Sequence, residues 1–101
     1  MNKALENTPA GRRAAETLAA QAFSWVAEDA DRLNAFMAMT GAGPADVVRN
    51  ATSARFLGTV LDYILTEDAL VIAFCDSRSI SYTLPIQARA LLPGGEIWNW
   101  T

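Results

Sequence analysis

The stretch from Phe56 to Cys75, FLGTVLDYILTEDALVIAFC, decides the fold of this chain. Its apolar residues recur in adjacent pairs every four residues, in one run before Thr66-Glu67-Asp68 and in a second run after it. This spacing is typical of an amphipathic helix, and the three polar residues favour the end of one helix and the start of another. The stretch therefore predicts two consecutive helices, Ala54–Leu65 and Thr66–Cys75, at the hydrophobic centre of an all-α domain.

Capping residues, prolines and glycines divide the rest of the chain into further helices. Thr8 before Pro9, Asp29 and Ser53 are favourable N-caps, and Gly41 suits the left-handed position after a helix. Helices this short cannot form a long parallel bundle, so we expect a compact bundle of five to six short helices with non-parallel packing. The additional helices are predicted at Pro9–Glu28, Ala30–Thr40, Pro44–Ala51 and Pro85–Leu91.

The helical period also predicts which side chains face the core and where the domain ends. We expect a disordered N-terminus over residues 1–7, one helical domain over residues 8–95 and a C-terminal tail over residues 96–101. The predicted inward positions of the first three helices are Ala15, Leu18, Ala22, Trp25 and Val26, then Leu33, Phe36 and Met37, then Val47, Val48 and Ala51.

Residues 77–84 leave two interpretations open. Ile80, Tyr82 and Leu84 alternate with polar residues, which is the period of a strand. Leu70–Cys75 and Ile80–Leu84 could therefore form a β-hairpin across the polar residues between them. The capping residues before Leu70 favour the helical interpretation of its segment, and residues 77–84 stay open between strand, loop and helix.

The amino-acid composition excludes several classes of function. The chain has 8 basic and 11 acidic residues, a net charge of −3, one cysteine and no stretch long and apolar enough to cross a bilayer. An acidic protein binds nucleic acid and anionic membranes poorly. A single cysteine is typical of a protein in a reducing compartment. No apolar leader segment occurs near Met1. We therefore expect a cytoplasmic protein that binds no membrane.

Four segments of the chain share a distinctive order of core and capping residues. They are Leu33…Phe36…Met39-Thr40-Gly41, Phe56-Leu57…Val60-Leu61-Asp62-Tyr63…Leu65, Glu67-Asp68…Leu70…Ala73-Phe74 and Pro85…Ala88-Arg89…Leu92-Pro93-Gly94-Gly95. This order resembles a family of small bacterial proteins, domain of unknown function family 3572. The likeness covers Trp25 to Gly95, and the resemblance implies a helical fold without an assigned activity. One further shared feature is the turn Thr40-Gly41-Ala42-Gly43-Pro44, whereas Ser77 to Thr83 is more strand-like than the family pattern.

No catalytic, cofactor or metal site is predicted. The chain has no histidine, which removes Ser-His and Cys-His nucleophile pairs. Cys75 falls on the predicted inner face of its helix, where a thiol acts as a small apolar side chain. The acids around the two central helices, Asp62, Glu67, Asp68 and Asp76, fall on a polar helix face or near helix ends, where solvated carboxylates are common.

Two functions remain. The first is a non-enzymatic module that binds another protein or itself, with homodimerisation as one form, through Trp98 and Trp100, because tryptophan is frequent in binding hot spots. The alternative is a weak helix-turn-helix regulator, since the turn before Pro44 has a suitable length and Arg49, Asn50 and Arg55 could face nucleic acid. Two arginines on an acidic chain make this alternative the weaker one.

Overall fold

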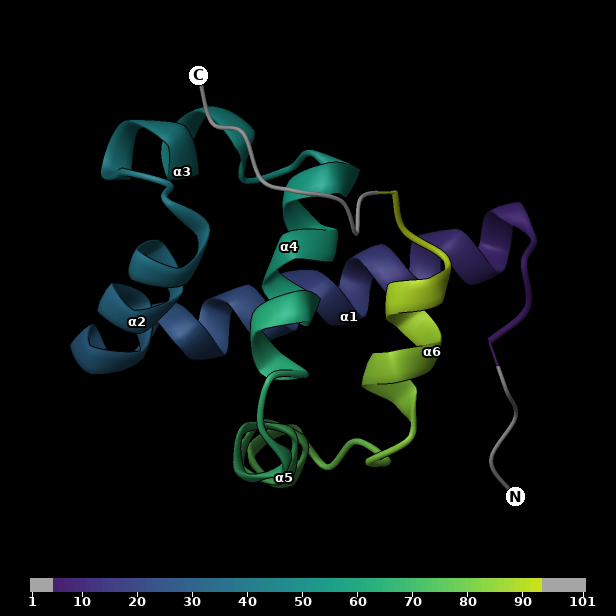
Figure 1. The fold of residues 1–101 in the computed structure, drawn as a ribbon. Coiled ribbons are helices and arrows are strands. Elements are labelled where there is room, and N and C mark those ends of the chain that lie inside the picture. The colour runs from purple at the N-terminus through teal and green to yellow at the C-terminus, as the bar shows by residue number, and fades with distance from the viewer. Residues whose placement is uncertain (1–4, 94–101) are drawn as a thin grey trace.

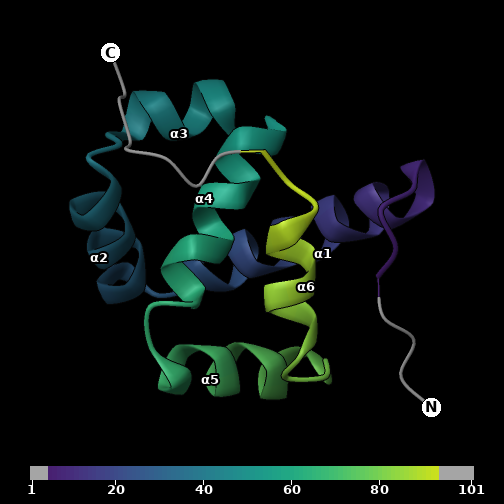
Figure 2. The same ribbon diagram turned by 45° about the vertical axis from the view of Figure 1, so that its right-hand side comes forward.

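A computed structural model describes residues 5–93, which form six α-helices joined by short loops (Figure 1). In this described part no strand occurs, and the predicted all-α bundle with non-parallel packing is confirmed. The long α1 crosses behind α4 and α6, which stand beside each other (Figures 1 and 2). The helices are α1 (Pro9–Ala27), α2 (Ala30–Thr40), α3 (Pro44–Asn50), α4 (Ala54–Ile64), α5 (Asp68–Arg78) and α6 (Leu84–Ala90).

The predicted start and stop signals act as expected in the first four helices. The Thr8 hydroxyl accepts a hydrogen bond from the Gly11 N–H at 3.0 Å, and the Asp29 carboxylate accepts from the N–H groups of Asp31 and Arg32 in the first turn of α2. Gly41 ends α2 in the left-handed region at φ 75°, and the Ser53 hydroxyl caps α4. These side chains satisfy backbone donors that the helix itself leaves unpaired, which fixes where each helix begins.

α5 begins at Asp68, two residues after the predicted start of this helix, and Thr66 belongs to the end of α4 instead. Its hydroxyl donates a hydrogen bond back to the Tyr63 carbonyl oxygen at 2.7 Å, which closes the end of α4. The N-cap of α5 is Glu67, whose side chain makes no capping hydrogen bond. A threonine between two helices can cap the second helix or donate a hydrogen bond to a carbonyl at the end of the first. Here the Thr66 hydroxyl donates to a carbonyl oxygen at the end of α4.

The β-hairpin interpretation of residues 70–84 is wrong, because α5 continues to Arg78 and a loop then leads to α6. Ser79 adopts the left-handed conformation at φ 56°, and the Ile80 N–H donates to the Cys75 carbonyl oxygen at 2.9 Å. This pattern terminates a helix without a strand. α6 begins at Leu84, one residue before the predicted Pro85.

The core is built around α4, where eight of eleven residues are buried. α1 supplies the opposing surface, mostly through small or apolar residues that let the two helices approach closely. An aromatic cluster fills the space toward α2, with neighbouring ring centroids 5.3 to 6.3 Å apart in edge-on arrangements that favour aromatic contacts. Its members are Phe23, Phe36, Phe56 and Tyr63.

α5 lies at the edge of the molecule, below the lower end of α4 in Figure 2. Only two of its eleven residues, Phe74 and Cys75, are buried, and the Phe74 ring lies 5.8 Å from the Trp25 ring of α1. The prediction that α4 and α5 share the hydrophobic centre is therefore right for α4 and wrong for α5. Val48 is also misassigned, since it is 81% exposed on a short α3 that buries none of its residues.

Contacts with the core begin before α1. The Leu5 N–H donates to the Gln87 side-chain oxygen of α6 at 2.9 Å, and Leu5 packs against the core. The carbonyl of Glu6 lies so close to Gly11 that a side chain at Gly11 would overlap it. The predicted disorder of residues 1–7 and the tail at 96–101 stay predictions, since residues 1–4 and 94–101 lie outside the described part.

Candidate functional site

The segment from α5 to α6 carries most of the large apolar side chains that the structure leaves exposed. Across residues 5–93 there are five such side chains, and three of them are Ile72, Tyr82 and Ile86, with exposed fractions of 45%, 52% and 63%. The other two, Met39 and Val48, lie on α2 and α3. Apolar side chains that gather on one segment indicate an interaction surface more than scattered ones do.

The helical period explains why Ile72 is exposed. Phe74 and Cys75 point into the core, and the side of α5 away from them carries Ala69, Ile72, Ala73 and Asp76. All four of these residues are exposed. We call this set the α5 face.

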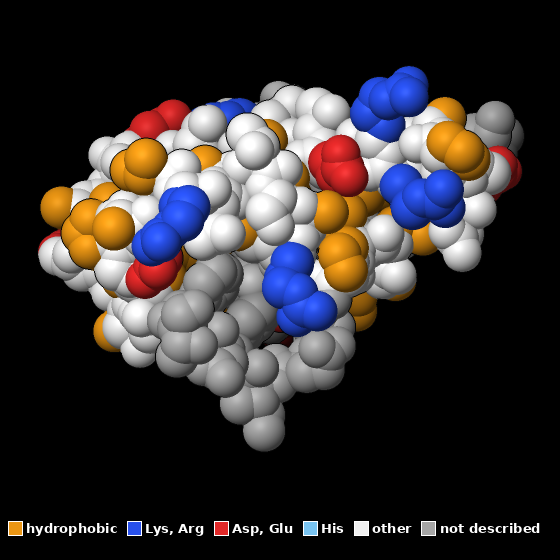
Figure 3. Space-filling model, turned by 90° about the horizontal axis from the view of Figure 1, so that it is seen from above, with side chains coloured by type: hydrophobic (Ala, Val, Ile, Leu, Met, Phe, Trp, Pro, Cys, Tyr) orange, Lys and Arg blue, Asp and Glu red, His pale blue; other side chains and the backbone are white. Residues whose placement is uncertain are grey.

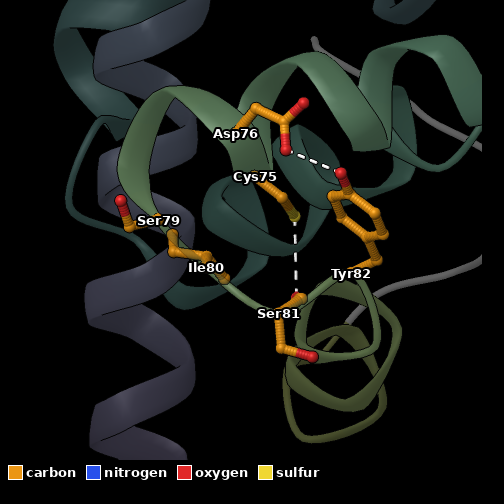
Figure 4. Close-up of a pocket in the computed structure, with 6 residues that line it drawn as sticks. All are labelled: Cys75, Asp76, Ser79, Ile80, Ser81 and Tyr82. Atoms are coloured by element: carbon orange, nitrogen blue, oxygen red, sulfur yellow. Dashed lines mark hydrogen bonds between the residues drawn. The ribbon is translucent and has the colours of Figure 1, made fainter.

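Tyr82 extends the α5 face across the loop that follows the helix. Its hydroxyl donates a 2.6 Å hydrogen bond to a carboxylate oxygen of Asp76, as Figure 4 shows. This hydrogen bond is the main cause that raises the pKa of Tyr82 above its ordinary value. The same hydrogen bond holds the Tyr82 ring next to the last turn of α5.

A shallow, open pocket of 470 Å³ lies between Tyr82 and the end of α5. Figure 4 shows Tyr82 and Asp76 on one side of it, Ser79 and Ile80 on the other, and the Cys75 sulfur between them. The pocket is lined by Cys75, Asp76, Ser79, Ile80, Ser81 and Tyr82.

The Cys75 thiol at this pocket is a structural group. Its side chain is buried, and its sulfur donates to the Ser81 carbonyl oxygen at 3.6 Å. Burial, followed by the charge of Asp76, raises the pKa of Cys75 above its ordinary value. Because the thiolate is the nucleophilic form, these surroundings suppress reactivity at neutral pH.

The charges around the α5 face are mainly negative. Glu67 and Asp68 stand at one end and Asp76 at the other, and all three are exposed. The one basic residue of α5, Arg78, turns away and pairs with Glu28, the residue that follows α1, at 2.8 Å. The apolar part of the α5 face therefore lies between carboxylates.

The carboxylates that the sequence singled out do not converge. Asp62 pairs with Arg89 of α6 at 2.5 Å, and Asp76 accepts from Tyr82. Glu67 and Asp68 lie at the opposite end of α5 from Asp76. Among residues 5–93, no group of three or more histidine, cysteine, aspartate or glutamate side chains could hold a metal ion.

The residues of the nucleic-acid alternative lie around α3 and the start of α4. Arg49 pairs with Asp46 at 3.3 Å, and the Asn50 side chain donates to the Asp46 carbonyl oxygen at 2.8 Å. Arg55 is exposed in the first turn of α4. Viewed from above, this side of the molecule has basic side chains spread over it and interspersed with acidic and apolar ones (Figure 3).

Two arginines have structural roles that the sequence analysis did not predict. Arg89 donates to Asp62 and to the Leu92 carbonyl oxygen, which ties α6 to α4. Arg32 lies 3.9 Å from the Trp25 ring centroid and donates twice to the Trp25 carbonyl oxygen, which ties α2 to α1. Only the role of Arg32 could have been suspected from the sequence, because Asp29 and Arg32 have the i,i+3 spacing of an ion pair along a helix.

Trp98 and Trp100 lie outside the described residues, so their predicted role in partner binding stays a prediction. Within residues 5–93, none of the helices has the length and apolar character needed to cross a membrane.

Comparison with known proteins gives a family and nothing more specific. No curated protein and no solved structure matches the chain. One family description, "Protein of unknown function (DUF3572)", matches residues 12–95, which cover all six helices except the first three residues of α1. The chain belongs to the DUF3572 family of proteins of unknown function.

Proposed function

We propose that this protein works by binding another protein through the α5 face and Tyr82, without catalysing a reaction. The observation that carries the proposal is the exposure of Ile72 in a helix whose residues 69–75 are all apolar. A helix that is apolar on all sides is normally covered on all sides. α5 is covered by its own chain through Phe74 and Cys75, with Leu70 and Val71 partly buried against the core, so the opposite side of the helix is available for a partner.

The position of Tyr82 supports the same proposal. Its ring is 52% exposed, yet the hydrogen bond to Asp76 holds it in place. An aromatic side chain that is already fixed loses little conformational entropy on binding. Tyrosine is accordingly one of the residues most enriched in binding hot spots.

Other parts of the earlier predictions stay proposals beside this one. Trp98 and Trp100 remain a second candidate anchor, and a cytoplasmic location remains the expected one. For helix-turn-helix binding of nucleic acid, Arg49 pairs with Asp46, and α3 has only seven residues. No observation in the described part favours that alternative over protein binding.

Site-specific photo-crosslinking in the native host tests the proposal. Benzoylphenylalanine at Ala73 places the probe on the α5 face, and the same residue at Ala20 places it on an exposed position of α1. We expect a discrete adduct from the Ala73 probe that is absent from the Ala20 probe. The same adduct pattern from both positions, or no adduct from Ala73, would contradict binding through this face.

A substitution in the same experiment separates contact from proximity. Ile72→Asp puts a charge on the α5 face and should remove the Ala73 adduct. Asp31→Asn, on the exposed first turn of α2, serves as the control and should leave it intact. An adduct that survives Ile72→Asp would show that the partner does not pack on this face.

A further inference from the structure

We propose that the pocket beside Tyr82 holds an arginine side chain of the bound protein, while the α5 face packs against apolar residues of the same segment. This inference rests on the proposed function and names the chemistry of the partner. Four features of the described residues lead to it: an available carboxylate, a helix C-terminus, an aromatic wall and the lack of a basic residue in the pocket lining.

The first feature is the Asp76 carboxylate. One of its oxygens accepts the hydrogen bond from Tyr82, and within residues 5–93 its other oxygen has no partner. The Ser79 hydroxyl, on the opposite side of the pocket, likewise has none in the described part. The carboxylate can accept hydrogen bonds from a cation at the mouth of the pocket, whereas the Ser79 hydroxyl points away from the other lining residues in Figure 4.

The second feature is the place of the pocket on the helix. It lies at the C-terminal end of α5, where the last backbone carbonyls give the helix its negative pole. This negative pole stabilises a positive charge independently of the Asp76 carboxylate. The local field and the carboxylate therefore favour the same kind of ligand.

The third and fourth features select arginine. The Tyr82 ring forms one wall, and a planar guanidinium can stack on it while donating to a carboxylate. No basic side chain lines the pocket, since the nearby Arg78 is drawn to Glu28. An ammonium group has no flat surface to stack, so lysine should bind more weakly.

The charges argue against a second copy of this chain as the occupant. The chain carries a net charge of −3, and the α5 face lies between Glu67, Asp68 and Asp76. Two such faces in contact would bring like charges together, which is unfavourable. A helical segment with an arginine and apolar residues one or two turns away would match both the charge and the spacing of α5.

Nuclear magnetic resonance titration of the full-length protein tests the assignment. The probes are two synthetic helical peptides with two leucines on one face, the first with an arginine on that face and the second with citrulline in its place. We expect the arginine peptide to shift the amide signals of Asp76 and Ser79 to Tyr82. Its affinity should exceed that of the citrulline peptide at least about tenfold, because only a charged donor gains fully from the carboxylate.

Substitutions identify the group responsible. Asp76→Asn keeps the size of the side chain and an acceptor for the Tyr82 hydroxyl but removes the charge. It should lower the affinity for the arginine peptide at least about tenfold. Asp68→Asn makes the same charge change at the other end of α5 and should alter affinity less than about twofold, since that position is exposed and screened. A peptide with lysine should bind more weakly than the one with arginine.

Three results would overturn the proposal. These are equal affinity for the arginine and citrulline peptides, equal loss with Asp68→Asn and Asp76→Asn, and dimerisation of the wild type that Ile72→Asp abolishes. Circular dichroism melts of each variant check that the fold is retained.

The two levels of the argument fail separately. An Ala73 adduct that persists unchanged with Asp76→Asn would overturn the arginine pocket and leave protein binding intact. Failure to form any Ala73 adduct would overturn protein binding through this face, and with it the partner named here.

Discussion

The neighbouring helices α4 and α5 have the same length and the same share of apolar residues, but most of α4 is buried and most of α5 is not. Each has seven apolar residues among eleven, yet α4 buries eight residues and α5 only two. α4 is surrounded by α1, α2, α5 and α6, whereas α5 packs on its own chain with one side. Burial therefore follows from the number of neighbours around a helix, and hydrophobicity alone does not determine it.

The largest expected effects concern the inner faces, where the two helices should behave alike. Leu61 and Phe74 are both fully buried. Leu61→Ala should lower the free energy of unfolding by about 2–5 kcal/mol and Phe74→Ala by about 3–5 kcal/mol, because each leaves a cavity. Urea denaturation of both variants measures this. A loss below about 1 kcal/mol for Phe74→Ala would mean that even the inner side of α5 is not part of the core.

Gly58 tests how tightly α4 is enclosed by the rest of the chain. A Cβ atom at this position would lie 2.7 Å from the Pro93 carbonyl oxygen, so glycine is needed for the chain after α6 to pass close to α4. Gly58→Ala should therefore destabilise by about 1–3 kcal/mol. In an open helix the same change stabilises by about 1 kcal/mol. A gain in the melting temperature of Gly58→Ala would show that α4 is less enclosed than described.

The ion pairs of the two helices offer a matched test. Asp62–Arg89 joins α4 to α6 at 2.5 Å with both side chains largely covered, while Glu28–Arg78 joins the residue that follows α1 to α5 with the glutamate half exposed. Double-mutant cycles should give about 1.5–3 kcal/mol for the first pair and about 0.2–1 kcal/mol for the second. Equal coupling energies would remove this distinction between the two helices.

A smaller effect of opposite sign is expected at the end of α5. Ser79 holds φ at 56°, a conformation that a side chain disfavours and glycine adopts freely. Ser79→Gly should stabilise the fold by up to about 1 kcal/mol, because relief of the strain exceeds the added freedom of the unfolded chain. Thermal melts followed by circular dichroism measure the gain, and a loss of stability would argue that the Ser79 side chain has structural contacts that outweigh the strain.

The sequence predicted the helices well because local signals determine them. Thr8, Asp29, Gly41 and Ser53 act within one turn of their own helix, and such interactions are readable from spacing alone. The strand period of residues 80–84 left their structure open, because a loop can also alternate apolar and polar residues, and here Ile80 and Leu84 pack on the core.

The candidate site was not predictable in the same way. Nothing in the spacing of Asp76 and Tyr82 indicates a hydrogen bond, because it depends on the turn that Ser79 makes between them. The exposure of Ile72 and Val48 depends on which helices lie nearby, which is a property of the whole fold. A helical period shows which residues share a face, but it does not show whether anything covers that face.

The stability of Ile72→Asp tests the central claim most directly, because it asks whether the α5 face belongs to the core. The claim that this face is open to solvent and reserved for a partner predicts a free energy of unfolding within about 0.5 kcal/mol of the wild type, as for other surface substitutions. A loss of more than about 2 kcal/mol would mean that a charge had been buried without a partner, and it would contradict the account.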